Sequence, residues 1–247
     1  MVFSSLFFIF AFLVLCYGIY LFAPSIKAKN TVLLVFSLIF YAWGGPPLVL
    51  LLCLETLICF VGAHLIWSCN PAPFHAEGGK GGKKAFLAIT VGLCLALLVI
   101  YKYTGFFTDT VTGLFGLENL LPKVALPIGI SFFTFQALSY VIDVSRGQVA
   151  LQKNYGKLLL YISFFPQLVA GPIVKASDFI PQLYKHFHLG RKQFGIAIFW
   201  ILNGLAKKII LSDYIAVNFI DRVFENPLLF TGFENLAALF GYSLQVY

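Results

Sequence analysis

The chain has 247 residues, of which 60% are hydrophobic and only 11% are charged, and its formal net charge is +7. So few charges in so apolar a chain exclude an ordinary water-soluble domain and predict an integral membrane protein. The basic excess falls in the loops between apolar windows. We therefore expect it to set membrane orientation, and we expect no nucleic-acid partner.

Membrane-length windows follow one another along most of the chain. A helix needs roughly 20 apolar residues to cross the hydrocarbon layer. Windows that approach this length cover residues 3–24, 31–46, 48–67, 85–101, 124–142, 158–174 and 194–211. They predict an all-α fold, a polytopic membrane helix bundle with about six to eight spans or partial spans. The first window lacks a basic leader and a small-residue cleavage site, so we expect it to remain as a helix.

Basic residues mark every second loop. They follow the first, third and fifth windows: Lys27, Lys29, Lys80, Lys83, Lys84, Arg146, Lys153 and Lys157. Under the positive-inside rule these loops are cytoplasmic, which places the N-terminus outside.

Metal and cofactor signals are missing from the sequence. The five cysteines lie in or beside apolar windows, with no pair at ligand spacing, so we expect no metal site and no bound cofactor. Of the four histidines, His75, His186 and His188 fall in predicted loops. His64 and Glu55 fall inside one predicted span, where an ionisable group faces protein or water. About two and a half helical turns separate them, so they should not pair directly.

One predicted helix carries a polar stripe. Phe133, Gln136, Tyr140 and Asp143 recur at steps of three and four residues, which places them on one helical face. Because an unpaired amide or carboxylate is costly in hydrocarbon, this face should avoid lipid. Gln136 can either bond to a neighbouring helix or line a passage, and both alternatives stay open. For Asp143 we expect an ion pair with Arg146.

The next window contains helix breakers. Pro166 removes a backbone hydrogen bond, and Gly171 with Pro172 provides a second break. Broken backbone at membrane depth is tolerated where it is buried in protein or lines a cavity. This pattern predicts a broken or re-entrant segment that walls a substrate passage. The candidate passage-lining residues are Gln136, Tyr140, Asp143, Pro166, Gln167, Gly171 and Pro172.

Two long motifs give the chain a family resemblance. Residues 126–136 read LPIGISFFTFQ, residues 140–143 read YVID, and residues 164–174 read FFPQLVAGPIV. These runs resemble the membrane-bound O-acyltransferase family. The opening MVFSS and the run FYAWG at residues 40–44 resemble its bacterial branch for alginate O-acetylation.

The resemblance implies a function and a set of partners. Relatives of this kind pass an acyl group from a cytoplasmic donor, acetyl-CoA or an acyl carrier, through a central funnel with a histidine as base. It implies residence in the bacterial inner membrane among lipids, an extracytoplasmic acetyltransferase partner and a polysaccharide acceptor. The family's catalytic histidine lies in a later segment, and none of the four histidines matches it. We therefore expect no catalytic residue in this chain, and we expect residues 1–247 to be the N-terminal part of a single domain truncated before the catalytic segment.

Three other functions remain open at this stage. Proteins that export D-alanine to teichoic acid share much of the same core. A secondary transporter also uses broken helices and polar groups inside the membrane, and would show uptake without acyl transfer. The third alternative is a non-catalytic scaffold left by truncation.

Overall fold

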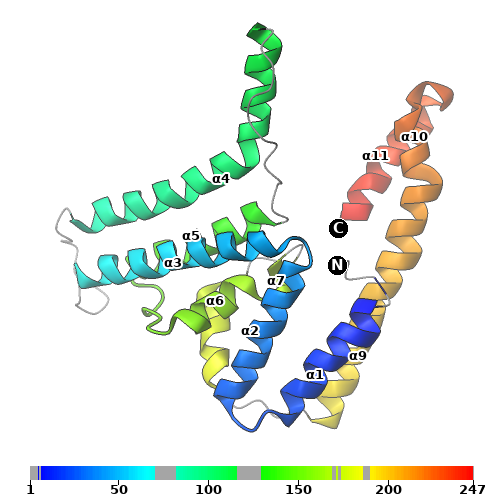
Figure 1. Ribbon diagram of the computed structural model, residues 1–247. Helices are drawn as coiled ribbons and strands as arrows, with labels where there is room; N and C mark the ends of the chain where they lie inside the picture. The colour runs from blue at the N-terminus through cyan, green and yellow to red at the C-terminus, as the bar shows by residue number, and fades with distance from the viewer. Residues whose placement is uncertain are drawn as a thin grey trace. The chain divides into compact units, whose positions relative to one another are not determined.

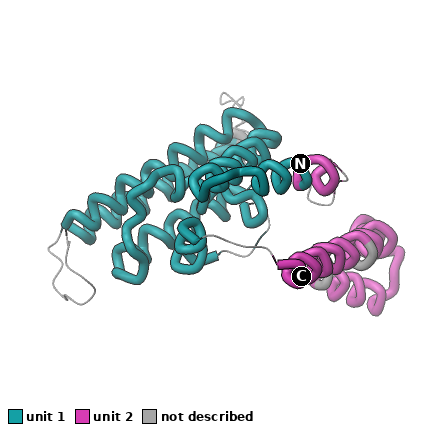
Figure 2. The backbone as a smooth tube through the Cα atoms, turned by 90° about the horizontal axis from the view of Figure 1, so that it is seen from below, with its two compact units in different colours: residues 1, 14–186 teal, residues 2–13, 187–247 magenta. Residues whose placement is uncertain are grey.

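The computed structural model describes residues 5, 7–69, 82–115, 129–168, 171, 174–185 and 190–246. Within these ranges the regular elements are helices and no strand occurs, which confirms the all-α prediction. The chain divides into two compact units, residues 1 and 14–186 and residues 2–13 with 187–247, shown in different colours in Figure 2. Each unit is described by itself.

The first unit is a bundle organised around α3. Its helices in chain order are α1 (Leu13–Phe22), α2 (Ile26–Ala42), α3 (Pro46–Ser68), α4 (Gly82–Phe115), α5 (Ile130–Ser145), α6 (Tyr155–Ser163), α7 (Phe165–Leu168), α8 (Ala176–Phe179) and the 3-10 helix η2 (Ile180–Tyr184). α3 packs along α4 and α5, and α2 packs against α6 and α3 (Figure 1). The hydrophobic core lies mainly where α3, α4, α5 and α6 meet.

Two helices in the described ranges have the length and apolar composition of a membrane span. They are α3 (Pro46–Ser68) and the part of α4 from Gly82 to Phe106. Both support a membrane protein, and among the described helices they are the full-length candidates within the predicted six to eight spans or partial spans. Two other windows fall short of this length for local reasons: the apolar helix over Phe8–Phe22 is shorter than a span, and the window 158–174 is interrupted.

Small residues set the spacing between α3 and α4. The buried positions of α3 recur at helical spacing and are Leu51, Leu52, Glu55, Thr56, Cys59, Gly62, Ala63 and Ile66. A side chain at Gly62 would overlap Thr90 of α4, so the two backbones approach closely there. One turn away, the Sγ atoms of Cys59 and Cys94 lie 3.5 Å apart. Close approach of this kind maximises van der Waals contact where lipid gives no hydrophobic drive to associate.

The second unit is built from short, partly π-helical pieces. They are η1 (Phe8–Phe12), α9 (Arg191–Ala206), η3 (Lys207–Asp213), η4 (Ala216–Ile220), α10 (Asp221–Glu225), the 3-10 helix η5 (Pro227–Leu229) and α11 (Gly232–Val246). α11 packs back on η3, η4 and α10. Thr231 and Glu234 form a capping box that begins α11: the Thr231 N–H donates to the Glu234 carboxylate (2.8 Å), and the Glu234 N–H donates to the Thr231 hydroxyl (3.3 Å).

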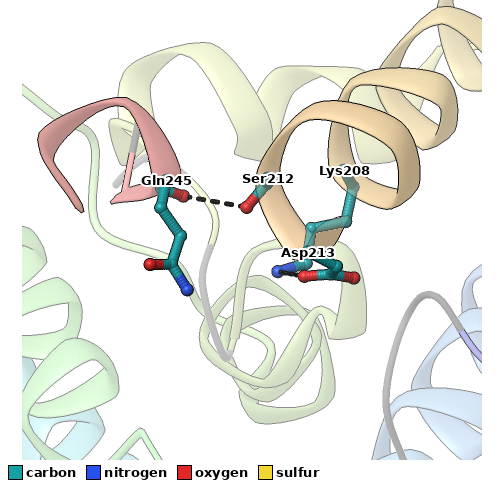
Figure 3. A network of polar contacts seen from close by, with 4 residues as sticks. All are labelled: Lys208, Ser212, Asp213 and Gln245. Atoms are coloured by element: carbon teal, nitrogen blue, oxygen red, sulfur yellow. Dashed lines mark hydrogen bonds and ion pairs between the residues drawn. The ribbon is translucent and has the colours of Figure 1, made fainter. Parts of the chain in front are cut away.

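Polar contacts hold the turn of η3. Lys208 and Asp213 form a 2.7 Å ion pair, and the Ser212 hydroxyl donates to the backbone carbonyl of Gln245 at 3.3 Å (Figure 3). The wide i→i+5 turn of a π-helix brings residues five apart onto one face, which suits this ion pair. Both charged side chains are about half exposed, so the pair contributes little to stability.

The close approach at Gly62 gives a first prediction. Gly62→Ala should destabilise the protein by about 1–3 kcal/mol, because the new methyl group must push α4 away. Gly92→Ala in α4 is the matched control, since a methyl group there meets nothing within 4 Å. It should be neutral or stabilise by up to about 1 kcal/mol. Thermal unfolding of both variants in one detergent measures the difference, and equal midpoints would contradict the packing argument.

Candidate functional site

The polar stripe of α5 faces protein, as the sequence predicts. Phe133, Gln136 and Tyr140 are at most 2% exposed, and Asp143 is half-buried. α5 begins after Gly129, whose φ of 77° is a left-handed conformation that favours glycine. The stripe packs where α5 meets α3, α4 and α6. Its position in the interior leaves open which side chains bond within the protein and which face a passage.

The break after α6 also occurs where the sequence predicts it. α6 ends at Ser163, Phe164 leaves the helical conformation, and α7 begins at Phe165 with Pro166 in its first turn. Proline is tolerated there because the first N–H groups of a helix have no intrahelical partner. Pro166 itself is exposed on its unit, whereas Gln167 is buried.

The broken helix leaves a buried carbonyl without its usual partner. In a continuous helix the Tyr161 carbonyl would accept from the N–H four residues on, that of Phe165. That N–H donates instead to the Ser37 hydroxyl of α2 at 3.3 Å. Two side-chain amides replace it: Gln136 Nε2 donates to the Tyr161 carbonyl at 2.9 Å and Gln167 Nε2 donates to it at 2.7 Å.

This arrangement uses both lone pairs of one carbonyl oxygen. It therefore satisfies a group that would be costly to leave unpaired in the core. Of the two alternatives for Gln136, the structure shows the bond to a neighbouring helix. A role for Gln136 or Gln167 in lining a passage stays a prediction.

Tyr140 and Tyr161 hold the segments on either side of α6. The Tyr140 hydroxyl accepts from the Gln152 N–H at 3.0 Å, which fixes the loop between α5 and α6. The Gln152 side-chain oxygen accepts in turn from the Tyr184 hydroxyl at 3.0 Å. The Tyr161 hydroxyl donates to the Val174 carbonyl at 2.8 Å, beyond the second break.

The expected Asp143–Arg146 ion pair is wrong. In the described part of the chain the two side chains form no ion pair. Arg146 is still helical, with its N–H bonded to the Ile142 carbonyl, but its side chain is exposed, where an ion pair gains little over solvation. Gly147 then adopts a φ of 73°, and the Gln148 N–H donates to the Asp143 carbonyl at 2.9 Å, in a Schellman turn that ends the helix after Arg146.

The second predicted break is partly described. Gly171 lies in a bend, where its N–H donates to the Gln167 carbonyl at 3.3 Å. A Cβ at Gly171 would lie 2.5 Å from the Cα of Gln167, so the backbone leaves no room for a side chain there. Pro172, the last of the candidate lining residues, lies outside the described residues.

A second polar group lies deeper in the bundle, around Glu55. The Glu55 side chain is 1% exposed and lies near Tyr41 of α2 and Thr134 of α5. Among the described atoms, none of the Glu55 carboxyl, Tyr41 hydroxyl and Thr134 hydroxyl oxygens makes a hydrogen bond of ordinary geometry, although Thr134 is close enough to interact with the carboxyl. Unsatisfied polar atoms in a core need an explanation, and an ionisable group inside a span is a functional candidate.

The histidines contribute nothing to this group. His64 Nδ1 bonds to the carbonyl of Phe60 at 2.8 Å, one turn back on α3, and its ring contacts the Phe60 ring in a tilted arrangement. His75, His186 and His188 lie outside the described residues. In the described ranges no three His, Cys, Asp or Glu side chains gather as a metal site would require.

Comparison with known proteins supports the family resemblance. No family model matches it, and no solved structure does. It is 35% identical over 255 residues to a probable alginate O-acetylase of Pseudomonas putida, covering 100% of this chain and 50% of the relative. It is 27% identical over 278 residues to a peptidoglycan O-acetyltransferase of Helicobacter pylori, again over 100% of this chain and 51% of the relative. A teichoic acid D-alanyltransferase of Lacticaseibacillus rhamnosus matches at 26% over 55% of the chain and 31% of the relative.

These matches confirm the resemblance to the membrane-bound O-acyltransferase family. It spans about half the length of the curated relatives that it matches along its whole length. The two motifs that carry the family resemblance are joined in space. Gln136 from the first and Gln167 from the second bond the same Tyr161 carbonyl, so the motifs form one structural unit.

Several residues of this structural unit were not predicted from the sequence. Tyr161 could have been found, because a proline five residues beyond it interrupts the helix that would satisfy its carbonyl. Ser37, which receives the displaced N–H, carries no such signal because it lies on α2, far away in sequence. Glu55 was noticed as an ionisable residue in a span, but its neighbours Tyr41 and Thr134 were not.

Because two amides donate to one carbonyl, we expect replacing them to have non-additive effects on the free energy of unfolding. Gln136→Leu or Gln167→Leu alone should destabilise by about 1 kcal/mol, since one amide still satisfies the Tyr161 carbonyl. The double variant should cost about 1–3 kcal/mol more than the sum, because the carbonyl is then buried and unpaired. A denaturation series in detergent tests this, with exposed Gln148→Leu as the control. Strict additivity would show that the two amides do not share this role.

Proposed function

We propose that the protein acts in O-acetylation of an exported or cell-surface polysaccharide, and that this chain forms its membrane core. The similarity of the whole chain to alginate and peptidoglycan O-acetyltransferases carries the proposal. Those two names share one reaction type, an acetyl group joined to a hydroxyl of a glycan. The D-alanyltransferase matches only about half of the chain at lower identity, so it is the second candidate.

The reaction gives the membrane core a defined task. An acetyl thioester, on coenzyme A or on an acyl carrier, loses its C–S bond while a C–O bond forms to the acceptor hydroxyl. The hydroxyl proton passes to a base, which typically contributes 10²–10⁴-fold to the rate. His64 is bonded to its own helix at Phe60, and we assign no catalytic residue among the described residues. Their proposed task is to hold donor and acceptor groups apart from lipid and in register.

The proposed setting is the bacterial inner membrane. Basic loops at Lys27–Lys29 and around Lys153 would face the cytoplasm, where the thioester donor is found. The acceptor polymer lies outside the cytoplasm, so the acyl group must cross the membrane. An extracytoplasmic acetyltransferase partner would then complete the transfer.

Disruption of the gene tests the proposal. Cells without it should export the same polymer with its acetyl esters lost, and the intact gene should restore them. Ester analysis of the purified polymer measures this. Loss of D-alanyl ester with unchanged acetyl ester would favour the second candidate. Solute uptake by reconstituted protein, with polymer esters unchanged, would favour a transporter and overturn the proposal.

The buried Glu55 carboxyl predicts a variant that keeps its stability and loses activity. Glu55→Gln should leave the unfolding midpoint unchanged or higher, because no described group makes a hydrogen bond of ordinary geometry to the carboxyl and a buried charge is costly. In the intact gene, the same change should lower polymer acetylation if the polar group serves transfer. Exposed Glu225→Gln is the control. A large loss of stability with Glu55→Gln would instead mark the carboxyl as a structural partner.

Orientation gives a further prediction. A Gln148→Cys variant, made after the native cysteines are replaced, should resist a membrane-impermeant maleimide in intact cells, because its loop is basic and should be cytoplasmic. Labelling should appear once the cells are permeabilised. Ready labelling of intact cells would reverse the proposed topology.

A further inference from the structure

A small cavity opens where α2 and α6 begin. Its volume is about 240 Å³, and among its lining residues are Lys27, Asn30, Thr31, Asn154, Gly156 and Lys157. This is smaller than the roughly 300–1,000 Å³ of a drug-sized ligand site, so it suits a single head group. The lining residues include two lysines and no acidic residue. The cavity is therefore electropositive.

The walls of the cavity are held in place by contacts with the rest of the first unit. Lys157 Nζ lies 3.1 Å from the ring centroid of Tyr184, a cation–π contact. Asn30 Nδ2 donates to the Leu183 carbonyl at 2.8 Å, which joins α2 to η2. These bonds orient one cation and one wall before any ligand arrives. Preorganisation of this kind lowers the cost of binding.

The N-terminal end of α6 lies at the cavity, and its first turn is already capped. Asn154 caps the helix, with its side-chain oxygen accepting from the Lys157 N–H at 3.1 Å. Gly156 keeps the approach open: a Cβ there would lie 3.3 Å from Asn154 Oδ1 and 4.0 Å from Leu34. The N-terminal end of a helix favours anions, and here it adds to two lysines at the same cavity.

We propose that this cavity binds a phosphate group, carried either by an anionic phospholipid or by a free phosphate compound. Basic pockets between membrane helices bind anionic head groups, and this one lies at helix ends. The apolar residue Leu34 lines the same cavity and suits the acyl chains of a lipid. This inference goes beyond the proposed acyl transfer and does not depend on it.

Lys27 is the residue that best tests the proposal. Its side chain is exposed, so replacing it should not unfold the protein, and Lys157 is avoided because it also contacts Tyr184. Lys27→Gln should weaken binding of phosphatidylglycerol about fivefold. Lys153→Gln removes the same charge from an exposed residue outside the lining and should bind as the unchanged protein does. Lys27→Arg should retain binding.

The measurement is native mass spectrometry of the full chain with phosphatidylglycerol, phosphatidylcholine or inorganic phosphate as separate probes. Preferential retention of phosphatidylglycerol over phosphatidylcholine supports the site if the preference is lost in the Lys27→Gln variant and kept in the Lys153→Gln variant. The phosphate is then that of a lipid. Lys27-dependent binding of inorganic phosphate without lipid preference supports it with a free phosphate source. Equal loss in the Lys27→Gln and Lys153→Gln variants, or no Lys27-dependent binding of any probe, would overturn it.

Discussion

The Tyr161 carbonyl is the constraint on which the first unit depends. A helix that stops inside a bundle leaves backbone oxygen atoms without donors, and a buried unpaired carbonyl costs about 1–3 kcal/mol. Here Gln136 and Gln167 both donate to that oxygen, while Ser37 takes the N–H that would have reached it. Three helices and the short α7 are thus tied to one break. The polar residues of the two motifs are needed because the chain is broken there.

The same physics explains what could be predicted from sequence. The spacing of residues along a helix and the position of a proline are local features of the sequence. The buried face of α5 and the break before Pro166 therefore follow from residue order alone. Which partner each polar group finds is a property of packing between distant segments. Gln136 therefore had two open alternatives, and Ser37 was not noticed. Asp143 was assigned to Arg146 from helical spacing, which holds through Arg146, but spacing does not show that the Arg146 side chain stays in solvent instead of pairing.

Glu55 is the opposite case from the Tyr161 carbonyl. Both are buried polar groups at contacts between α3, α5 or α6, yet one has two donors and the other makes no hydrogen bond of ordinary geometry among the described atoms. Structural polar groups are satisfied because an unsatisfied one costs stability without return. A carboxyl kept at 1% exposure beside two such hydroxyl groups is therefore, like the buried Ser163 hydroxyl, a feature of this core that packing does not account for.

α6 connects the broken segment to the cationic cavity. Asn154 and Lys157 meet the cavity at its start, and Tyr161 lies about one turn beyond Lys157 on the same helix. The Lys157 side chain can leave the Tyr184 ring by a change of rotamer, while the bonds from Gln136 and Gln167 to the Tyr161 carbonyl hold the backbone of α6. A ligand in the cavity therefore requires no movement of α6. The exposed Lys27 side chain can reach such a ligand without giving up a cation–π contact, whereas Lys157 must give one up.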